Sequence, residues 1–161
     1  MDIKTADLCD QFEADIRVAA PIFRVFGGAE SFGGRISTVQ VFEDNVLVRA
    51  ALETPGHGRV LVVQGGGSLR CALVGDVLAA LGHQNGWAGI VVHGCIRDSR
   101  AIARIPIGVR ALATNPLRSA KRGAGERDVP VTFADVTFMP GHYLYADADG
   151  IVVAERQLLE V

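Results

Sequence analysis

The amino-acid sequence predicts a single α/β domain over residues 1–161, built around a parallel strand–helix–strand unit. A chain of 161 residues that is 49% hydrophobic can bury one full core. Two short, uninterrupted apolar runs, Arg59–Val63 and Gly89–Val92, are typical of strands that are buried on both faces of a sheet. Between them, apolar residues recur at helical spacing from about Gly75 to His83. These three segments predict a right-handed βαβ crossover.

The segments before this unit predict two helices and one strand. Two apolar residues four positions apart, behind a Thr or Asp N-cap, predict a short helix over Thr5–Phe12. The glycine-rich segment Phe26–Gly34 is typical of a loop. Ile36–Val41 alternates apolar and polar residues and contains β-branched types, which indicates a half-buried strand. A second helix is expected over Asn45–Leu52.

The segments after the unit predict mainly β-structure. A short helix is expected over Arg100–Arg104 and a strand over Val109–Ala113. The stretch Leu117–Asp128 is basic and contains glycine, so it predicts a solvated loop rather than an anion or partner site built from Lys121, Arg122 and Arg127. The remaining segments predict three strands and two turns: Val129–Phe133, Val136–Phe138 and Ile151–Val153, with turns at Pro140-Gly141 and Asp149-Gly150.

Composition and charge exclude several classes of protein. The 16 Lys and Arg residues nearly balance the 18 Asp and Glu residues, so no strong field favours nucleic acid or an anionic membrane. No apolar run reaches the length of a membrane span, and the N-terminus has no basic segment followed by an apolar one. We therefore expect a cytoplasmic protein without direct nucleic-acid or membrane contacts.

The cysteines and histidines form no pattern of a disulfide framework or a zinc site. The three cysteines are an odd number without C-x-x-C spacing, which fits a reducing compartment and small core side chains: Cys9, Cys71 and Cys95. The four histidines do not combine with the cysteines at zinc spacing: His57, His83, His93 and His142.

The candidate site consists of an Arg-Asp pair and a more distant aspartate. Arg97 and Asp98 lie just after the second buried run, and twenty residues separate Asp76 from Arg97. In a parallel crossover, the start of the helix and the end of the second strand meet at one edge of the sheet, where open α/β sheets bind ligands. We therefore expect Gly75 and Asp76 to lie beside Arg97 and Asp98.

These residue types suit a small dianion and a divalent cation. The unpaired N–H groups at the helix start, from Leu73 to Asp76, would favour a carboxylate, and Gly75 would let it come near the backbone. The planar guanidinium of Arg97 could hold the other end of the dianion. Asp98, with Asp76 acting through water, offers the oxygen ligands that Mg²⁺ and Mn²⁺ prefer.

A purely structural interpretation of the same residues stays open. Asp76 would then cap the helix, and Arg97 and Asp98 would form a surface pair of little energetic consequence. Spacing alone favours this interpretation, because two acids and an arginine are common residues.

Two other patterns carry weaker signals. Gly65-Gly66-Gly67 lacks the lysine of a P-loop and the spacing of a dinucleotide fingerprint, so it does not favour nucleotide binding. Asp147-x-Asp149-Gly150 imitates the start of an EF-hand loop, but Leu158 occupies the position of the bidentate glutamate. We expect a hairpin turn there.

Further segments resemble those of one known family over nearly the whole chain. They are Thr5–Asp10, Ser31–Val39, Val62–Ser68, Gly123–Val129 and Tyr145–Ile151. Together with the candidate site, they are similar to the RraA family, which contains regulators of ribonuclease E and metal-dependent 4-hydroxy-4-methyl-2-oxoglutarate aldolases. The resemblance implies an α/β/β swivelling-type sandwich that assembles as a ring-shaped homotrimer with its sites between subunits.

The resemblance also implies roles for individual residues. D-x20-R-D is the hallmark of the enzymatic branch, and Asp76, Arg97 and Asp98 match it in full. Asp98 is then the expected metal ligand, and Arg97 and Asp76 are the expected catalytic residues, with Arg97 steadying a pyruvate enolate. The expected contacts to a small 2-oxo acid substrate are Gly75, Asp76, Val77, Leu78 and Arg97.

The implied activity is metal-dependent carbon–carbon cleavage, with Mg²⁺ or Mn²⁺ as the cofactor, in oxaloacetate and in 4-hydroxy-4-methyl-2-oxoglutarate. Retro-aldol cleavage needs a base for the alcohol proton, whereas decarboxylation does not. Longer aldolases of the family carry a C-terminal extension that is implied to bring an acidic group to a neighbouring subunit, and this sequence stops at Val161. Decarboxylation is therefore the firmer expectation.

The alternative from another class is a regulatory protein that binds and inhibits ribonuclease E without catalysis. The regulators without enzymatic activity look altered at the Arg-Asp pair. Retention of Arg97 and Asp98 argues against a purely regulatory protein, although one protein could serve both roles.

Overall fold

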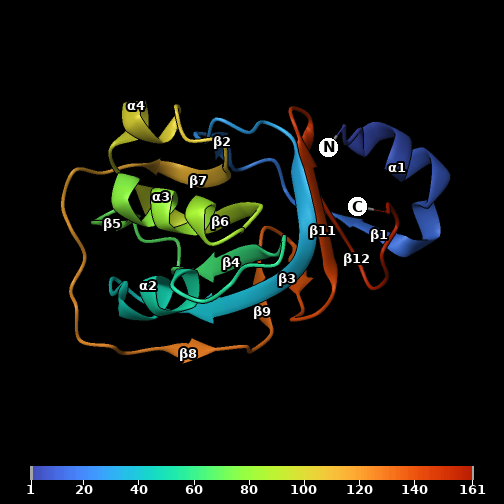
Figure 1. Cartoon of the computed structure of the whole chain (residues 1–161). Coiled ribbons are helices and arrows are strands. Elements are labelled where there is room, and N and C mark those ends of the chain that lie inside the picture. The colour runs from blue at the N-terminus through green and yellow to red at the C-terminus, as the bar shows by residue number, and fades with distance from the viewer. Residues whose placement is uncertain (1, 161) are drawn as a thin grey trace.

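A computed structural model describes residues 2–160. In it, the chain forms one layer of helices and two layers of strands (Figure 1). The helices are α1 (Thr5–Gln11), the 3-10 turn η1 (Glu13–Asp15), α2 (Val46–Leu52), α3 (Asp76–Gln84) and α4 (Ser99–Ile102). The strands are β1 (Ile16–Val18), β2 (Arg24–Val25), β3 (Phe32–Gln40), β4 (Val60–Gln64), β5 (Ala72–Val74), β6 (Gly89–Ile96), β7 (Gly108–Thr114), β8 (Glu126–Arg127), β9 (Val131–Phe133), β10 (Val136–Phe138), β11 (Tyr143–Asp147) and β12 (Gly150–Ala154).

Ten of the strands form one mixed sheet. Its order is β1-β12-β11-β3-β4-β6-β7-β2, with β5 paired to β6 and β8 paired to β3, whereas β9 and β10 form a separate hairpin. The neighbours β3, β4, β6 and β7 run parallel. The predicted crossover is confirmed, because β4 and β6 are parallel neighbours and α3 lies in the connection between them.

The parallel strands are buried on both faces, which explains their uninterrupted apolar runs. Side chains alternate between the two faces of a strand. Leu61 and Val63 of β4 therefore belong to the core under α2, α3 and α4, and Val60 and Val62 belong to the core against β9, β10, β11 and β12. In Figure 1, α2, α3 and α4 lie on one side of the tall strand β3, and α1 lies on the other side beside β1 and β12.

Strand β3 connects the two β-layers. Its first half, Phe32–Arg35, pairs antiparallel with β11, and its second half, Ile36–Gln40, pairs parallel with β4. The predicted loop Phe26–Gly34 is therefore wrong at its C-terminal end, where the glycines belong to a strand. The reason is close backbone approach: a Cβ on Gly34 would lie 2.1 Å from the carbonyl oxygen of Gly58.

The ring of Phe32 lies over two glycines of the parallel sheet. A Cβ on Gly89 or Gly108 would lie 2.3 Å or 2.0 Å from this ring. The buried guanidinium of Arg110 lies 5.3 Å from the ring centroid and donates hydrogen bonds to the carbonyls of Glu30 and Asp147. The start of β3 is thus packed against the centre of the sheet.

The other predicted elements are confirmed with shifts of one or two residues at most of their ends. All four predicted helices are present, as are the strands now labelled β7, β9, β10 and β12, and the turn after Asp147 joins β11 to β12. Five strands were not predicted: β1, β2, β5, β8 and β11. Within residues 2–160, no helix is both long and apolar enough to cross a membrane.

Candidate active site

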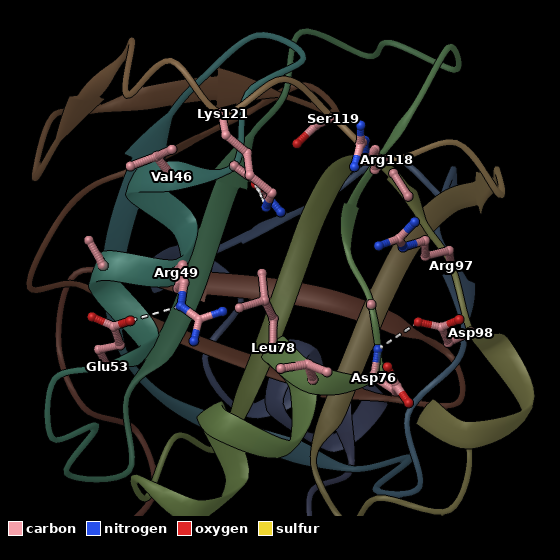
Figure 2. Close-up of a pocket in the computed structure, with 15 residues that line it drawn as sticks. Val46, Arg49, Glu53, Asp76, Leu78, Arg97, Asp98, Arg118, Ser119 and Lys121 are labelled. Atoms are coloured by element: carbon pink, nitrogen blue, oxygen red, sulfur yellow. Dashed lines mark hydrogen bonds and ion pairs between the residues drawn. The ribbon is translucent and has the colours of Figure 1, made fainter.

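A pocket with a volume of about 430 Å³ lies at the carboxyl ends of the parallel strands (Figure 2). Two of its walls are one face of α2 and the N-terminal turn of α3, and the others come from the segments that follow β6 and β7. Its lining residues are Asn45, Val46, Arg49, Ala50, Glu53, Ala72, Gly75, Asp76, Val77, Leu78, Arg97, Asp98, Arg118, Ser119 and Lys121. All six residues that the sequence analysis assigned to the site are among them.

Strands β5 and β6 bring the two parts of D-x20-R-D together. They are parallel neighbours, and the backbone N–H of Arg97 donates a hydrogen bond of 2.9 Å to the carbonyl oxygen of Val74. Both strands therefore end at the same level of the sheet. Gly75 and Asp76 follow one strand, and Arg97 and Asp98 follow the other.

The start of α3 is occupied by a carboxylate of the protein itself. The backbone N–H of Asp76 donates a hydrogen bond of 3.1 Å to Oδ2 of Asp98. The amides of Leu73 to Asp76 are the expected seat of a substrate carboxylate, but Leu73 and Val74 belong to β5, and the Asp76 amide is engaged by Asp98. The sequence predicts that these two pairs lie side by side, but it does not predict this hydrogen bond.

Asp98 adopts a backbone conformation that most residues avoid. Its φ and ψ angles are 59° and 41°, in the left-handed region, which aspartate tolerates better than most other non-glycine residues do. This conformation turns the chain between β6 and α4. Strained positions of this kind cluster at functional sites.

Gly75 gives the carboxylate of Asp98 the space that it occupies. A Cβ on Gly75 would lie 2.7 Å from Oδ2 of Asp98 and 3.4 Å from Cγ of Arg97. Both side chains would have to shift if residue 75 had a side chain. The Gly75-Asp76 and Arg97-Asp98 pairs therefore fit each other closely.

The structural interpretation of these residues meets two obstacles. Asp76 is not the N-cap of α3, because Gly75 holds that position. Arg97 and Asp98 are both exposed, and neither belongs to any of the three ion pairs found within residues 2–160.

Helix α2 forms the opposite wall of the pocket. Figure 2 shows Val46, Arg49 and Glu53 projecting from this helix, across the pocket from Arg97 and Asp98. Arg49 and Glu53 form an i,i+4 ion pair of 2.9 Å, so their charges largely offset each other. Leu78 of α3 lies between the two walls in Figure 2 and is 6% exposed.

The segment after β7 completes the rim with polar and basic groups. Arg118, Ser119 and Lys121 line the pocket, and Ser119 is only 6% exposed. Nζ of Lys121 donates a hydrogen bond of 3.2 Å to Oδ1 of Asn45. The predicted exposure of this loop is confirmed for Lys121, Arg122 and Arg127, whereas Ser119 is buried.

The charged groups of the pocket favour an anion that is accompanied by a cation. Four basic side chains line it, from Arg49, Arg97, Arg118 and Lys121, against three carboxylates, from Glu53, Asp76 and Asp98. After the Arg49–Glu53 pair is set aside, three basic groups face two carboxylates. The three basic groups can bind the carboxylates of a dianion, and the two carboxylates can bind a divalent cation.

The donor set suits a hard cation that keeps part of its water shell. Within residues 2–160, no group of three or more His, Cys, Asp or Glu side chains could hold a metal ion. Zinc sites usually need three or four such protein ligands. Mg²⁺ is often bound by only one or two carboxylates with water and substrate oxygens, which Asp98 and Asp76 could provide.

The weaker sequence patterns have structural explanations. Gly66 and Gly67 adopt positive φ angles in the turn after β4, where the Gly66 N–H donates to the side chain of Gln64. The carboxylate of Asp147 accepts hydrogen bonds from Thr5 and from the Asp149 N–H, in the expected hairpin turn. The three cysteines are free thiols: Cys9, Cys71 and Cys95.

A comparison with protein families identifies the chain. The profile described as "RraA-like: Aldolase/RraA" matches residues 5–153, which include every residue of the pocket. The chain belongs to the RraA-like family. Its mixed α/β architecture is the RraA-like fold, as the sequence analysis expected.

Relatives within the RraA-like family carry several different names. A protein of Aromatoleum aromaticum named "Putative 4-hydroxy-4-methyl-2-oxoglutarate aldolase" is 60% identical over 159 residues, which cover 99% of this chain and 100% of that protein. A crystal structure from Geobacillus kaustophilus, described as an S-adenosylmethionine:2-dimethylmenaquinone methyltransferase, has a TM-score of 0.94 at 54% identity and covers 97% of each chain. The RNA-processing inhibitor RraA from Thermus thermophilis has a TM-score of 0.95 at 46% identity and covers 100% of this chain and 98% of that one. One RraA-like fold thus carries three functional names, and the residues of the pocket must distinguish between them.

Proposed function

We propose that this RraA-like protein is a divalent-metal-dependent lyase that breaks a carbon–carbon bond in small 2-oxo dicarboxylates. The observation that carries the proposal is the convergence of Gly75-Asp76 and Arg97-Asp98 in a pocket that has further basic groups. Relatives that are 54% to 60% identical and are named as 4-hydroxy-4-methyl-2-oxoglutarate aldolases support the same reaction class. We expect cleavage of that compound and decarboxylation of oxaloacetate.

Arg97 is the proposed anchor for the pyruvyl half of the substrate. Its planar guanidinium can form paired hydrogen bonds with a carboxylate and can stabilise negative charge that develops on a neighbouring oxygen. Arg118 and Lys121 lie on the rim of the same pocket and would attract the second carboxylate. Val77 and Leu78 supply the apolar surface between these polar ends.

Asp98 is the proposed protein ligand of Mg²⁺ or Mn²⁺, and Asp76 would orient water beside it. When bound, such an ion would act as a Lewis acid toward the 2-oxo group of the substrate. The hydrogen bond from the Asp76 N–H fixes Oδ2 of Asp98 and orients the carboxylate.

The two reactions share one product and differ in their proton requirements. In oxaloacetate, the bond to the distal carboxylate breaks, carbon dioxide leaves, and the electron pair remains as the enolate of pyruvate. In 4-hydroxy-4-methyl-2-oxoglutarate, a base must also remove the alcohol proton before pyruvate and a pyruvate enolate separate. Protonation of the enolate carbon then gives pyruvate in both cases. Arg97 would stabilise the enolate in both reactions.

A coupled assay of pyruvate release tests the proposal. Purified protein is mixed with either substrate and a reporter dehydrogenase, with Mg²⁺, with Mn²⁺ or with a chelator, and the spontaneous metal-catalysed decarboxylation rate is subtracted. We expect turnover only with a divalent ion, and a loss of about 100-fold or more in Asp98→Ala. The matched control is Asp149→Ala, in the distant β11–β12 turn, which should keep full activity. Turnover that survives chelation or the Asp98 change would refute the assignment.

We also propose that the protein assembles as a homotrimer with its sites between subunits. The support is that the pocket lies at an open edge of the fold and that Val77, which lines it, is 63% exposed. Light scattering coupled to gel filtration should give three times the chain mass of 17.1 kDa. A monomeric mass at micromolar concentration would contradict this assembly.

A second function is favoured by the structural match to an RNA-processing inhibitor at 46% identity. Under this proposal, the protein would bind ribonuclease E and lower its activity. A cleavage assay with purified ribonuclease E and a fluorescent RNA tests it, with Arg97→Ala and Asp98→Ala in parallel. Inhibition that persists in both variants would assign regulation to a surface outside the pocket.

A further inference from the structure

Asp44 is the most deeply buried carboxylate among residues 2–160. It lies two residues before α2, is 3% exposed, and belongs to none of the ion pairs found in this part of the chain. Burial of an ionised carboxylate is strongly unfavourable unless hydrogen bonds compensate for the lost water. Its partners should therefore indicate why the chain has an aspartate here.

Among residues 2–160, the groups that donate hydrogen bonds to the carboxylate of Asp44 are backbone N–H groups. The N–H of Val46 donates to Oδ1 at 3.1 Å, the N–H of Arg122 donates to Oδ2 at 2.7 Å, and the N–H of Gly123 lies 3.3 Å and 3.1 Å from the two oxygens. Burial raises the pKa of Asp44, but hydrogen bonds from these amides and from the N–H of Ala124 outweigh it and hold the pKa below its usual value. Asp44 is therefore ionised near neutral pH.

These hydrogen bonds attach the segment after β7 to the start of α2. A backbone bridge lies beside these bonds: the N–H of Ala120 donates to the carbonyl of Glu43 at 2.9 Å, and the N–H of Asn45 donates to the carbonyl of Ala120. The segment is also held on either side, where the N–H of Ala72 donates to the carbonyl of Leu117 and where β8 pairs with β3. Every residue from 120 to 128 is exposed, so side-chain burial contributes little to its position. Between these flanking contacts, Asp44 and the Ala120 bridge hold residues 120–123.

Lys121 lies between these two anchors. Its Nζ donates to Oδ1 of Asn45, and Nδ2 of Asn45 donates to the carbonyl of Leu73 at 3.2 Å. Figure 2 shows Lys121 on the rim of the pocket, on the side of α2, with Arg97 on the opposite side. The attachment of residues 120–123 to Asp44 therefore determines where the cation of Lys121 stands relative to Arg97.

We propose that Asp44 is a positioning residue that acts through Lys121: it fixes this cation where it can bind the second carboxylate of a 2-oxo dicarboxylate. The inference rests on the proposed function, because it assigns the pocket a substrate with two carboxylates. Asp44 itself touches no substrate. It contributes to selectivity for dicarboxylates over monocarboxylates.

Limited proteolysis tests the attachment without any assay of activity. Trypsin cleaves after lysine and arginine, and Lys121 and Arg122 lie in the segment that Asp44 holds. Asp44→Asn keeps the size of the side chain but turns an amide N–H₂ toward a backbone N–H, so cleavage at residues 121–122 should become at least about tenfold faster. The matched control is Asp147→Asn, another carboxylate held by backbone N–H groups but in the β11–β12 turn. It should leave cleavage at residues 121–122 unchanged, and equal cleavage of all three proteins would refute the attachment.

Ligand binding tests the positioning. Titration calorimetry with Mg²⁺ compares 2-oxoglutarate, a dicarboxylate, with pyruvate, a monocarboxylate. Asp44→Asn and Lys121→Met should each lower the affinity for 2-oxoglutarate about tenfold, as expected for the loss of one charged contact. The affinity for pyruvate should fall less than about twofold. In the double variant the two losses should not add, because both remove the same interaction.

Three outcomes would overturn the proposal. They are additive losses in the double variant, an equal loss for both ligands, and the same selectivity change in Asp147→Asn. Absence of lyase turnover in the unaltered protein would instead refute the proposed reaction while the binding comparison still decides the role of Asp44. If the unaltered protein binds neither acid, both proposals fail.

Discussion

The backbone N–H of Asp76 donates a hydrogen bond of 3.1 Å to the carboxylate of Asp98, 22 residues further along the chain. The first turn of α3 therefore orients an acidic side chain of the protein. Unpaired amides and a positive dipole end make a helix N-terminus a favourable place for a carboxylate. Asp98 is thereby held in one orientation, with its second oxygen outside this hydrogen bond. This geometry leads to the first two predictions.

Asp98→Asn should abolish most activity without unfolding the protein. Asparagine tolerates the left-handed conformation of residue 98, and its side-chain oxygen can still accept the Asp76 N–H. The negative charge is lost, so pyruvate release should fall about 100-fold or more, while the free energy of unfolding changes by less than about 1 kcal/mol. Coupled kinetics and urea denaturation measure the two effects. An Asn variant that keeps half of the activity would contradict the metal-ligand role.

Gly75→Ala should displace the Asp98 carboxylate and damage the site. The added Cβ would lie 2.7 Å from Oδ2 of Asp98, closer than such atoms can approach. A displacement of this size should lower kcat/KM by about 10-fold to 100-fold. Gly94→Ala is the matched control, because its Cβ would meet its nearest neighbour at 3.4 Å. Equal kinetics in the two variants would exclude a close-fit role for Gly75.

Two carboxylates held by backbone hydrogen bonds should make the fold sensitive to acid. Burial raises the pKa values of Asp44 and Asp147, but hydrogen bonds from backbone N–H groups outweigh it, with Thr5 contributing at Asp147, and both pKa values lie below the ordinary 3.8. A depressed folded-state pKa contributes stability that is present above the unfolded pKa and is lost as pH falls through the folded one. Unfolding free energy should therefore fall below about pH 4. Chemical denaturation from pH 5 to 2 should show a shallower fall in Asp44→Asn than in the unaltered protein.

His93 should add a second acid-sensitive range at higher pH. Its ring stacks on Phe133 at 4.6 Å, and Nδ1 lies 2.6 Å from Oε1 of Gln64. Burial lowers the pKa of His93 below the ordinary 6.5. The unfolded chain then binds a proton more readily, so stability is fully present above pH 6.5 and declines as the pH falls below it. In His93→Gln, the unfolding free energy should change less with pH between about pH 6.5 and pH 5. An unchanged pH dependence would show that other groups cause it.

The β9–β10 hairpin should become more stable with glycine at residue 135. Ala134 and Asp135 have φ angles of 53° and 63° between the paired residues Phe133 and Val136, which is the geometry of a type I′ turn. Glycine at its second central position is favoured, so Asp135→Gly should raise the unfolding free energy by about 0.5 kcal/mol. Asp149→Gly, at a turn residue without a positive φ, should lower it. Thermal denaturation compares the two variants.

The parts of the fold that the sequence predicts are those with a strong local pattern. Strands β4 and β6 are apolar at nearly every position, and α3 has apolar residues at helical spacing between them. Strands β5 and β11 were not predicted, although β9 and β4 have the same lengths and were. Phe32–Gly34 reads as a loop from its glycines, although these glycines serve close packing within β3.

The parts of the pocket that the sequence predicts follow from the crossover. Asp76, Arg97 and Asp98 stand at the ends of recognisable elements, so their convergence follows from topology. Asn45 and Lys121 were not assigned, since the segment that carries Lys121 is positioned by hydrogen bonds to Asp44, about 78 residues away in sequence. No local pattern encodes such a contact, although a buried aspartate before a helix is a signal that can be sought.

The division of β3 between two layers has a consequence for synthesis on the ribosome. Residues 32–114 contain β3 to β7 and most of the pocket, but their second face is covered by β9 to β12, from residues 131–154. Until that later stretch emerges, a nascent chain displays Val60, Val62 and Val91 to solvent and chaperones. A nonsense mutation near codon 130 would therefore leave every pocket residue encoded and still yield a product that quality-control proteases clear.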